Sequence, residues 1–156
     1  MRTWRESLHD AWLTGASASL LSTAALGICG RIEQGTAVGP NNGPSQWLWG
    51  EQAAFERRAT LQHTAAGYAI HHLMSTFWAA LHERLFGGVA ATGSVPQTLA
   101  AGALTSALAC FVDYRLTPRR LRPGFEKQLS RTALFFVYAA FAAGLVLPQL
   151  VRRLRV

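Results

Sequence analysis

The chain has 156 residues, half of them hydrophobic and only 15% charged, whereas charged residues make up about 25% of ordinary soluble domains. Its net charge is +7, and Lys127 is the one lysine among 15 basic residues. Because the arginines flank apolar segments, anionic lipid headgroups are the expected partners. The sequence carries no zinc-finger, helix-turn-helix or RNA-recognition pattern, so we do not expect nucleic-acid binding.

Four apolar segments fill most of the chain, over residues 11–30, 64–85, 96–112 and 132–151. Each is near the length of a membrane crossing, which needs about 20 largely apolar residues. The first, third and fourth contain no charged residue, and they lack the polar stripe of a helix in a soluble bundle. The sequence therefore predicts an all-α fold, an integral membrane four-helix bundle that forms a single membrane domain over residues 1–156.

Two of these segments carry small residues at every fourth position. In order along the chain they are Gly15, Ser19, Thr23 and Gly27, then Thr98, Gly102, Ser106 and Cys110. Small residues at this spacing let neighbouring helices approach closely. We therefore expect the first and third helices to pack in the interior of the bundle.

The connections between the segments carry their own signals. Residues 31–60 form the longest one, rich in turn formers between Gly39 and Gly50. Trp47 and Trp49 lie in it, and tryptophans are typical of the membrane interface, so we expect this loop to fold there. The pair Gly87-Gly88 predicts the end of the second helix.

The second segment is the most polar and holds the histidines that could carry chemistry. Ionisable groups at membrane depth are costly and face a protein interior or water. Asp113 ends the third segment on the side where the second begins, so that side gathers several polar groups. The candidate polar site consists of His63, His71, His72, Asp113, Asn42 and Gln46. The alternative is that the histidines only pack and hydrogen-bond, and that Asp113 forms an interfacial ion pair with Arg115 or Arg119.

The histidine spacing does not favour a metal site. His71 and His72 point about 100° apart on a helix, and His82 lies roughly 16 Å along the axis from His71. The sequence also lacks HExxH, Walker and nucleophile-elbow motifs. We therefore predict no catalytic residue, no metal ligand and no cofactor.

A basic connector precedes the fourth segment. It holds a group of arginines, Arg115, Arg119, Arg120 and Arg122. We expect this group to contact lipid headgroups.

Three stretches resemble one family. GPSQWLWG (43–50), GYAIHHLMSTFWA (67–79) and DYRLTPRRLRPGFEKQLS (113–130) are similar to small four-helix membrane proteins of unassigned function from proteobacteria. The resemblance implies four helices and a multi-pass location in a bacterial inner membrane, and it brings no activity with it.

The expected function is that of a non-enzymatic membrane protein, an accessory, assembly or structural subunit that binds further copies of itself or a partner membrane protein. The small-residue faces and the missing catalytic set favour this hypothesis. One alternative is a small oligomeric transporter or proton-linked carrier that uses His71, His72 and Asp113. Another is a haem- or metal-dependent membrane enzyme.

Overall fold

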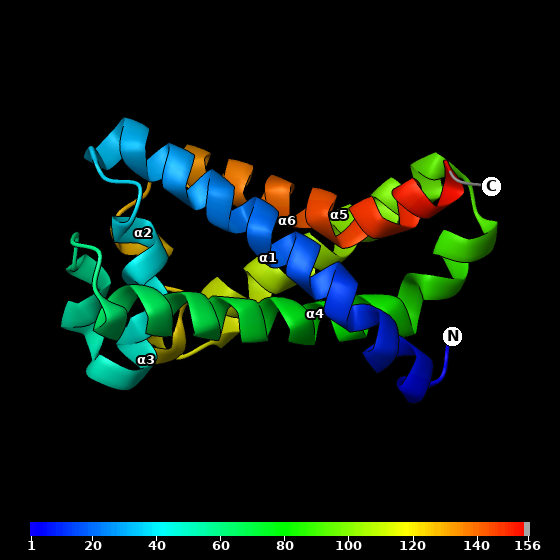
Figure 1. The fold of residues 1–156 in the computed structure, drawn as a ribbon, viewed down its shortest axis with the longest axis horizontal. Helices are drawn as coiled ribbons and strands as arrows, with labels where there is room; N and C mark the ends of the chain where they lie inside the picture. Colours follow the sequence, from blue (N-terminus) through cyan, green and yellow to red (C-terminus); the bar gives the residue numbers. More distant parts are fainter. Residues whose placement is uncertain (155–156) are drawn as a thin grey trace. The chain divides into compact units, whose positions relative to one another are not determined.

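The computed structural model describes residues 1–154, with the backbone alone at Ala90 and Ala91. Long helices dominate it, and the described residues contain no strand (Figure 1). The long helices are α1 (Trp4–Gln34), α4 (Ala66–Thr92), α5 (Val95–Phe111) and α6 (Arg131–Arg153). The short helices are α2 (Gly39–Asn42) and α3 (Gln46–Trp49). Short 3₁₀ turns cover Gly43–Ser45, Glu51–Phe55, Arg119–Leu121 and Phe125–Lys127, and π turns cover Leu61–Ala65 and Val112–Leu116.

The predicted segments 11–30 and 132–151 lie within α1 and α6, the segment 64–85 begins two residues before α4, and the segment 96–112 runs one residue beyond α5. The predicted helix end at Gly87-Gly88 is wrong. The α4 helix continues through both glycines to Thr92. Glycine destabilises a helix only modestly, and at Gly87 the missing side chain makes room for Arg2. The next helix, α5, begins at Val95, one residue before the predicted segment 96–112. Ser94 N donates to Gln97 Oε1 at 2.8 Å, and Gln97 N donates to Ser94 Oγ at 3.4 Å. This reciprocal capping box satisfies two backbone donors at the start of α5.

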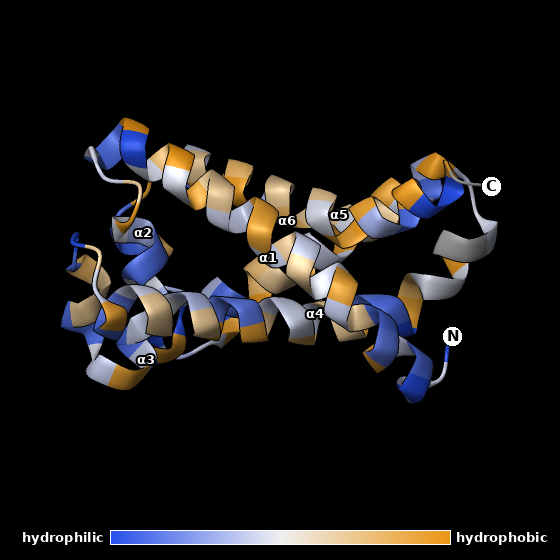
Figure 2. Cartoon of the chain, viewed as in Figure 1, coloured by the Kyte–Doolittle hydropathy of each residue, from blue (hydrophilic) through white to orange (hydrophobic). Residues whose placement is uncertain are grey.

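Among the residues that the structure describes, three helices are long and apolar enough to cross a membrane, judged by length and composition. They are α1, α5 together with its following π turn (Val95–Leu116), and α6. Although α4 has 27 residues, it is not among them, because its histidines and the Glu83-Arg84 pair lower its hydropathy. In Figure 2 the apolar colours dominate α6, whereas hydrophilic residues are more frequent around α3.

The contacts divide the chain into two compact units. The first unit comprises Met1–Ser22, His72–Ala109 and the chain from Ala139 onward, and the second comprises Thr23–His71 and Cys110–Tyr138. All four long helices contribute residues to both units.

In the first unit the helices touch backbone to backbone at glycines. A Cβ atom added at Gly15 of α1 would lie 2.7 Å from Thr76 Cα of α4, and one added at Gly144 of α6 would lie 2.4 Å from Ala18 Cα of α1. A Cβ added at Gly102 of α5 would meet the α6 residues Val146 and Ala142. The close approach that the small residues of α1 and α5 predict is thus confirmed at Gly15 and Gly102.

The second unit has an apolar core and a hydrogen-bonded loop region. Its core consists of Leu26, Phe125, Leu129, Ala133 and Val137. Gly43 packs against Gly124, where a Cβ would lie within 3.0 Å of backbone atoms on either side. This contact joins the 31–60 connection to the segment that precedes α6.

Candidate functional site

Asn42, predicted as part of a polar site, serves the loop structure of the second unit. It is fully buried. Its Nδ2 donates to the carbonyl oxygens of Glu56 at 2.9 Å and Arg58 at 3.0 Å, and its Oδ1 accepts from Thr64 Oγ1 at 2.8 Å. All the hydrogen-bonding groups of its amide are engaged, so Asn42 fixes the turn at residues 56–58.

Gln46 also uses both ends of its amide. Its Nε2 donates to Arg122 O at 2.6 Å, while its Oε1 accepts from Lys127 Nζ at 2.8 Å. Trp47 Nε1 donates to the same Arg122 carbonyl at 3.3 Å. The 43–50 motif and the basic connector are therefore held together through one backbone oxygen.

The remaining candidates of the second unit have separate sets of partners. His63 Nδ1 lies 3.1 Å from Thr60 Oγ1, and the His71 ring packs edge-on against Phe125 with ring centroids 5.6 Å apart. Asp113 accepts a hydrogen bond from Tyr138 OH at 2.6 Å. His72 belongs to the first unit, so the six predicted residues are not gathered within a single unit.

The predicted headgroup cluster lies largely on the surface. Arg115, Arg119 and Arg120 are exposed. Arg122 is half-buried and donates through Nε to Thr117 O at 3.3 Å. The contact of this arginine cluster with lipid headgroups stays a prediction.

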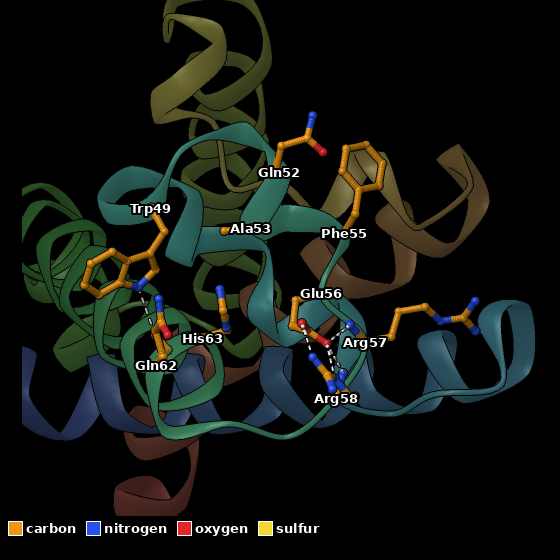
Figure 3. A pocket seen from close by; sticks show the side chains of 9 residues that line it. All are labelled: Trp49, Gln52, Ala53, Phe55, Glu56, Arg57, Arg58, Gln62 and His63. Carbon is orange, nitrogen blue, oxygen red and sulfur yellow. Dashed lines mark hydrogen bonds and ion pairs between the residues drawn. The ribbon is translucent and has the colours of Figure 1, made fainter.

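A shallow pocket of about 580 Å³ lies in the second unit (Figure 3). It is lined by Trp49, Gln52, Ala53, Phe55, Glu56, Arg57, Arg58, Gln62 and His63. Trp49 Nε1 donates to Gln62 O at 3.0 Å, which fixes one wall. On the opposite side, Glu56 Oε1 accepts from the backbone amides of Arg57 at 2.9 Å and Arg58 at 2.8 Å.

The Glu56 carboxylate also accepts from the Arg58 side chain. This side chain and the Arg58 backbone amide are the main reasons why the pKa of Glu56 is about 2, below its ordinary value of 4.5. A lowered carboxylate pKa stabilises the fold above pH 4.5, and this contribution is lost as the pH falls from 4.5 towards 2. We expect Arg58→Leu to raise the Glu56 midpoint in a carboxyl ¹³C NMR titration. Arg57→Leu is the matched control, because the Arg57 guanidinium bonds Gln34 O instead and its backbone amide survives. Equal midpoints in the two variants would contradict this assignment.

A second polar cluster, in the first unit, was missed by the sequence analysis. Its centre is Glu83 of α4, which is 2% exposed. Glu83 Oε1 accepts from Thr14 Oγ1 of α1 at 2.7 Å and from Gln149 Nε2 of α6 at 3.0 Å. Glu83 Oε2 accepts from Arg2 Nη1 at 3.0 Å. One buried carboxylate thus joins α1, α4, α6 and the segment before α1.

Asp10 extends this cluster. Arg2 Nη1 also donates to Asp10 Oδ2 at 2.7 Å, and Arg152 Nη1 lies 3.5 Å from the same oxygen. Gly87 makes room for Arg2, since a Cβ there would lie 2.5 Å from Arg2 Cδ and 2.8 Å from Glu83 Oε2. Two carboxylates and two guanidinium groups balance, which removes the large cost of an unpaired buried charge.

His82 lies beside this network and is 1% exposed. Its Nδ1 is 2.9 Å from Thr105 Oγ1 of α5. The sequence signal that could have revealed this cluster is Glu83 itself, a carboxylate within a mostly apolar segment, because such a group needs an interior partner.

Within residues 1–154 no group of three or more His, Cys, Asp or Glu side chains is placed to hold a metal ion.

Comparisons with family models, with curated proteins and with solved structures found no match.

Proposed function

We propose that the protein is an integral membrane protein of a bacterial inner membrane, that α1, α4, α5 and α6 all cross the bilayer as a four-helix bundle, and that it acts as a non-enzymatic accessory or assembly subunit. The observation that carries the proposal is the distribution of side chains around the long helices. It differs from the distribution in a water-soluble helical protein, whose helices turn a polar face outward.

Large apolar side chains lie on the outside of the helices. Among the most exposed are Trp12 (71%), Ile28 (62%), Leu73 (64%), Leu104 (59%) and Phe135 (69%). Small hydroxyl residues take many of the buried positions, beside alanines and a few larger apolar residues: Ser7, Thr14, Ser19, Ser22, Ser75, Thr98, Thr105 and Ser106. Hydroxyl and small residues between helices and large apolar residues outside are the arrangement that a lipid solvent favours.

The same distribution supports α4 as a fourth crossing. Its charged and polar groups His82 and Glu83 are buried, whereas Leu73, Phe77 and Leu85 are 64%, 50% and 43% exposed. Overall hydropathy counts every residue of a helix, but lipid meets only the outward ones. The inward polar groups therefore do not oppose insertion once their partners are in place.

An accessory role agrees with how the polar residues are used. Asn42 and Gln46 bind backbone carbonyl oxygens, and Glu83 joins helices, so these groups serve the fold itself. The apolar outer faces remain available for lipid, for further copies or for a partner membrane protein.

Bilayer insertion can be tested with a spin label at two positions of the full chain in lipid nanodiscs, with both native cysteines replaced by serine. We expect a label at Leu104, an exposed residue of α5, to be reached by oxygen and not by a water-soluble nickel complex. A label at the exposed loop residue Gln52 is the control and should show the opposite. Equal access of the nickel complex to both labels would refute the bilayer location.

The subunit role is tested by the native mass and absorption spectrum of the protein purified in mild detergent. We expect a complex with a partner membrane protein or with further copies, and no visible absorption band. A stable single chain would contradict the subunit role, and a Soret band would favour a haem enzyme.

A further inference from the structure

Pro148 interrupts the backbone hydrogen bonds of α6. It is buried and lies inside the helix, five residues before the end at Arg153. Proline has no N–H, so the carbonyl oxygen of Gly144, four residues earlier, receives no donor from the position that supplies one in a regular α-helix. The proline ring also pushes against that carbonyl group. The α6 helix can therefore bend at residues 144–148.

Ser17 of α1 supplies the missing donor. Its Oγ lies 2.5 Å from Gly144 O. A carbonyl oxygen can only accept, so the hydrogen between these two atoms belongs to the Ser17 hydroxyl. Ser17 Oγ also lies 3.0 Å from Thr14 O, but that carbonyl group has the regular backbone donor of its own helix. The Gly144 carbonyl group lacks this donor, so it depends on Ser17.

The missing side chain of Gly144 lets the two helices come this close. A Cβ atom there would lie 2.4 Å from Ala18 Cα and 2.7 Å from Ser17 O. Glycine also gives the turn before Pro148 more backbone freedom than any other residue would. Three residues therefore act together: Pro148 leaves a carbonyl group without a donor, Gly144 allows α1 to approach, and Ser17 donates.

Residues 149–153, which follow the proline, form a short arm of α6 that contacts the rest of the first unit. The contacts run through side chains to α4, α1 and α5. They are Gln149 Nε2 to Glu83 Oε1 at 3.0 Å, Arg152 Nη1 to Asp10 Oδ2 at 3.5 Å and Arg153 Nη2 to Thr98 Oγ1 at 2.9 Å. These pairs can form only while the backbone at the base of the arm is directed towards the other helices. The direction of that backbone depends on residues 144–148.

We propose that residues 144–148 are a hinge in α6 and that the Ser17 hydroxyl holds this hinge closed. In the closed state the arm lies against the other helices of the first unit and completes the network around Glu83. When Ser17 cannot donate, the Gly144 carbonyl group turns towards water, the helix bends further at the proline, and the side-chain pairs of the arm separate. The hinge is independent of the subunit role and can succeed or fail without it.

The hinge is tested by measuring distances between two spin labels on the full chain in lipid nanodiscs, with both native cysteines replaced by serine. One label is placed at Trp12, an exposed residue of α1, and the other at Val151 in the arm. We expect a single narrow distance distribution in the labelled protein and a broader one in its Ser17→Ala variant. Labels at Trp12 and at the exposed Ala143, which precedes the hinge, are the control and should give the same distribution in both. An unchanged Trp12–Val151 distribution in Ser17→Ala would overturn the proposal.

Pro148→Ala supplies the decisive comparison, because it restores a backbone N–H that can donate to Gly144 O. We expect Ser17→Ala to lower the folding equilibrium constant at least about tenfold in the wild-type background, since it leaves an acceptor without a donor. In the Pro148→Ala background the loss should be clearly smaller, and the Trp12–Val151 distribution should stay narrow. Thr92→Ala is the matched control, because the Thr92 hydroxyl donates to a carbonyl oxygen of its own helix, Gly88 O at 3.1 Å, and its removal should leave the distances unchanged. Equal effects of Ser17→Ala in both backgrounds would mean that water already serves the Gly144 carbonyl group, and would also overturn the proposal.

Discussion

Replacing Glu83 by leucine is expected to lower the free energy of unfolding by about 3 kcal/mol, because removing one partner of a buried ion pair leaves the others unpaired. The substitution takes away the acceptor of Thr14, Gln149 and Arg2 at once. Unfolding of the purified protein in mixed detergent micelles, followed by helical circular dichroism, measures the loss. A loss below about 0.5 kcal/mol, the size of an ordinary surface change, would show that Glu83 does not hold the helices together.

Two further variants separate the ion pair from general damage. Arg2→Met leaves the Glu83 charge without its guanidinium, so the double variant Arg2→Met/Glu83→Leu should lose less than the sum of the single losses, by about 0.5–3 kcal/mol. Glu51→Leu breaks the exposed pair with Lys127 and should cost at most about 1 kcal/mol. Strict additivity of the first two substitutions would mean that Arg2 and Glu83 do not interact.

Gly144→Ala is expected to cost about 1–3 kcal/mol, the usual range for inserting an atom into a packed contact. The new Cβ would lie 2.4 Å from Ala18 Cα and 2.7 Å from Ser17 O, and backbone atoms cannot turn aside as a side chain can. Ser17 Oγ also donates to Gly144 O at 2.5 Å, so separating α1 from α6 would break this hydrogen bond.

Gly88→Ala is the matched control, since it makes the same change inside a helix. A Cβ at Gly88 meets no atom within 4 Å, so the substitution should stabilise the protein by about 0.5–1 kcal/mol through helix propensity alone. The same unfolding experiment compares the two variants. If Gly144→Ala also stabilised the protein, α1 and α6 would not approach each other closely at Gly144.

The helices could be predicted from the sequence because their signals are local. A segment such as 132–151, without a charge over 20 residues, has few alternatives to a long helix. The capping pair at the start of α5 is local as well, because Ser94 and Gln97 lie within four residues of each other. The helix end predicted at Gly87 was wrong because glycine serves there to make room for the side chain of Arg2, which is far away in the sequence.

The polar sites could not be predicted because they depend on distant partners. Thr14, Arg2 and Gln149 lie 69, 81 and 66 positions from Glu83, and no local pattern connects them. Asn42 and Gln46 were chosen for their polarity, but a sequence does not show that their amides donate to the carbonyl oxygens of Glu56 and Arg122. The sequence identifies groups able to bind, and only the fold shows which are already occupied.

The Glu83 network also has a consequence for biosynthesis. A lone carboxylate at the centre of a membrane helix costs about 2.5–3.5 kcal/mol on insertion. Under the proposal that α4 crosses the bilayer, Arg2 and Thr14, which precede α4 in the chain, leave the ribosome first and can meet Glu83 as α4 inserts. Gln149 and Arg152 follow only with α6. A nascent chain without its first helix should therefore fail at the insertion of α4, while one that lacks α6 should still insert it.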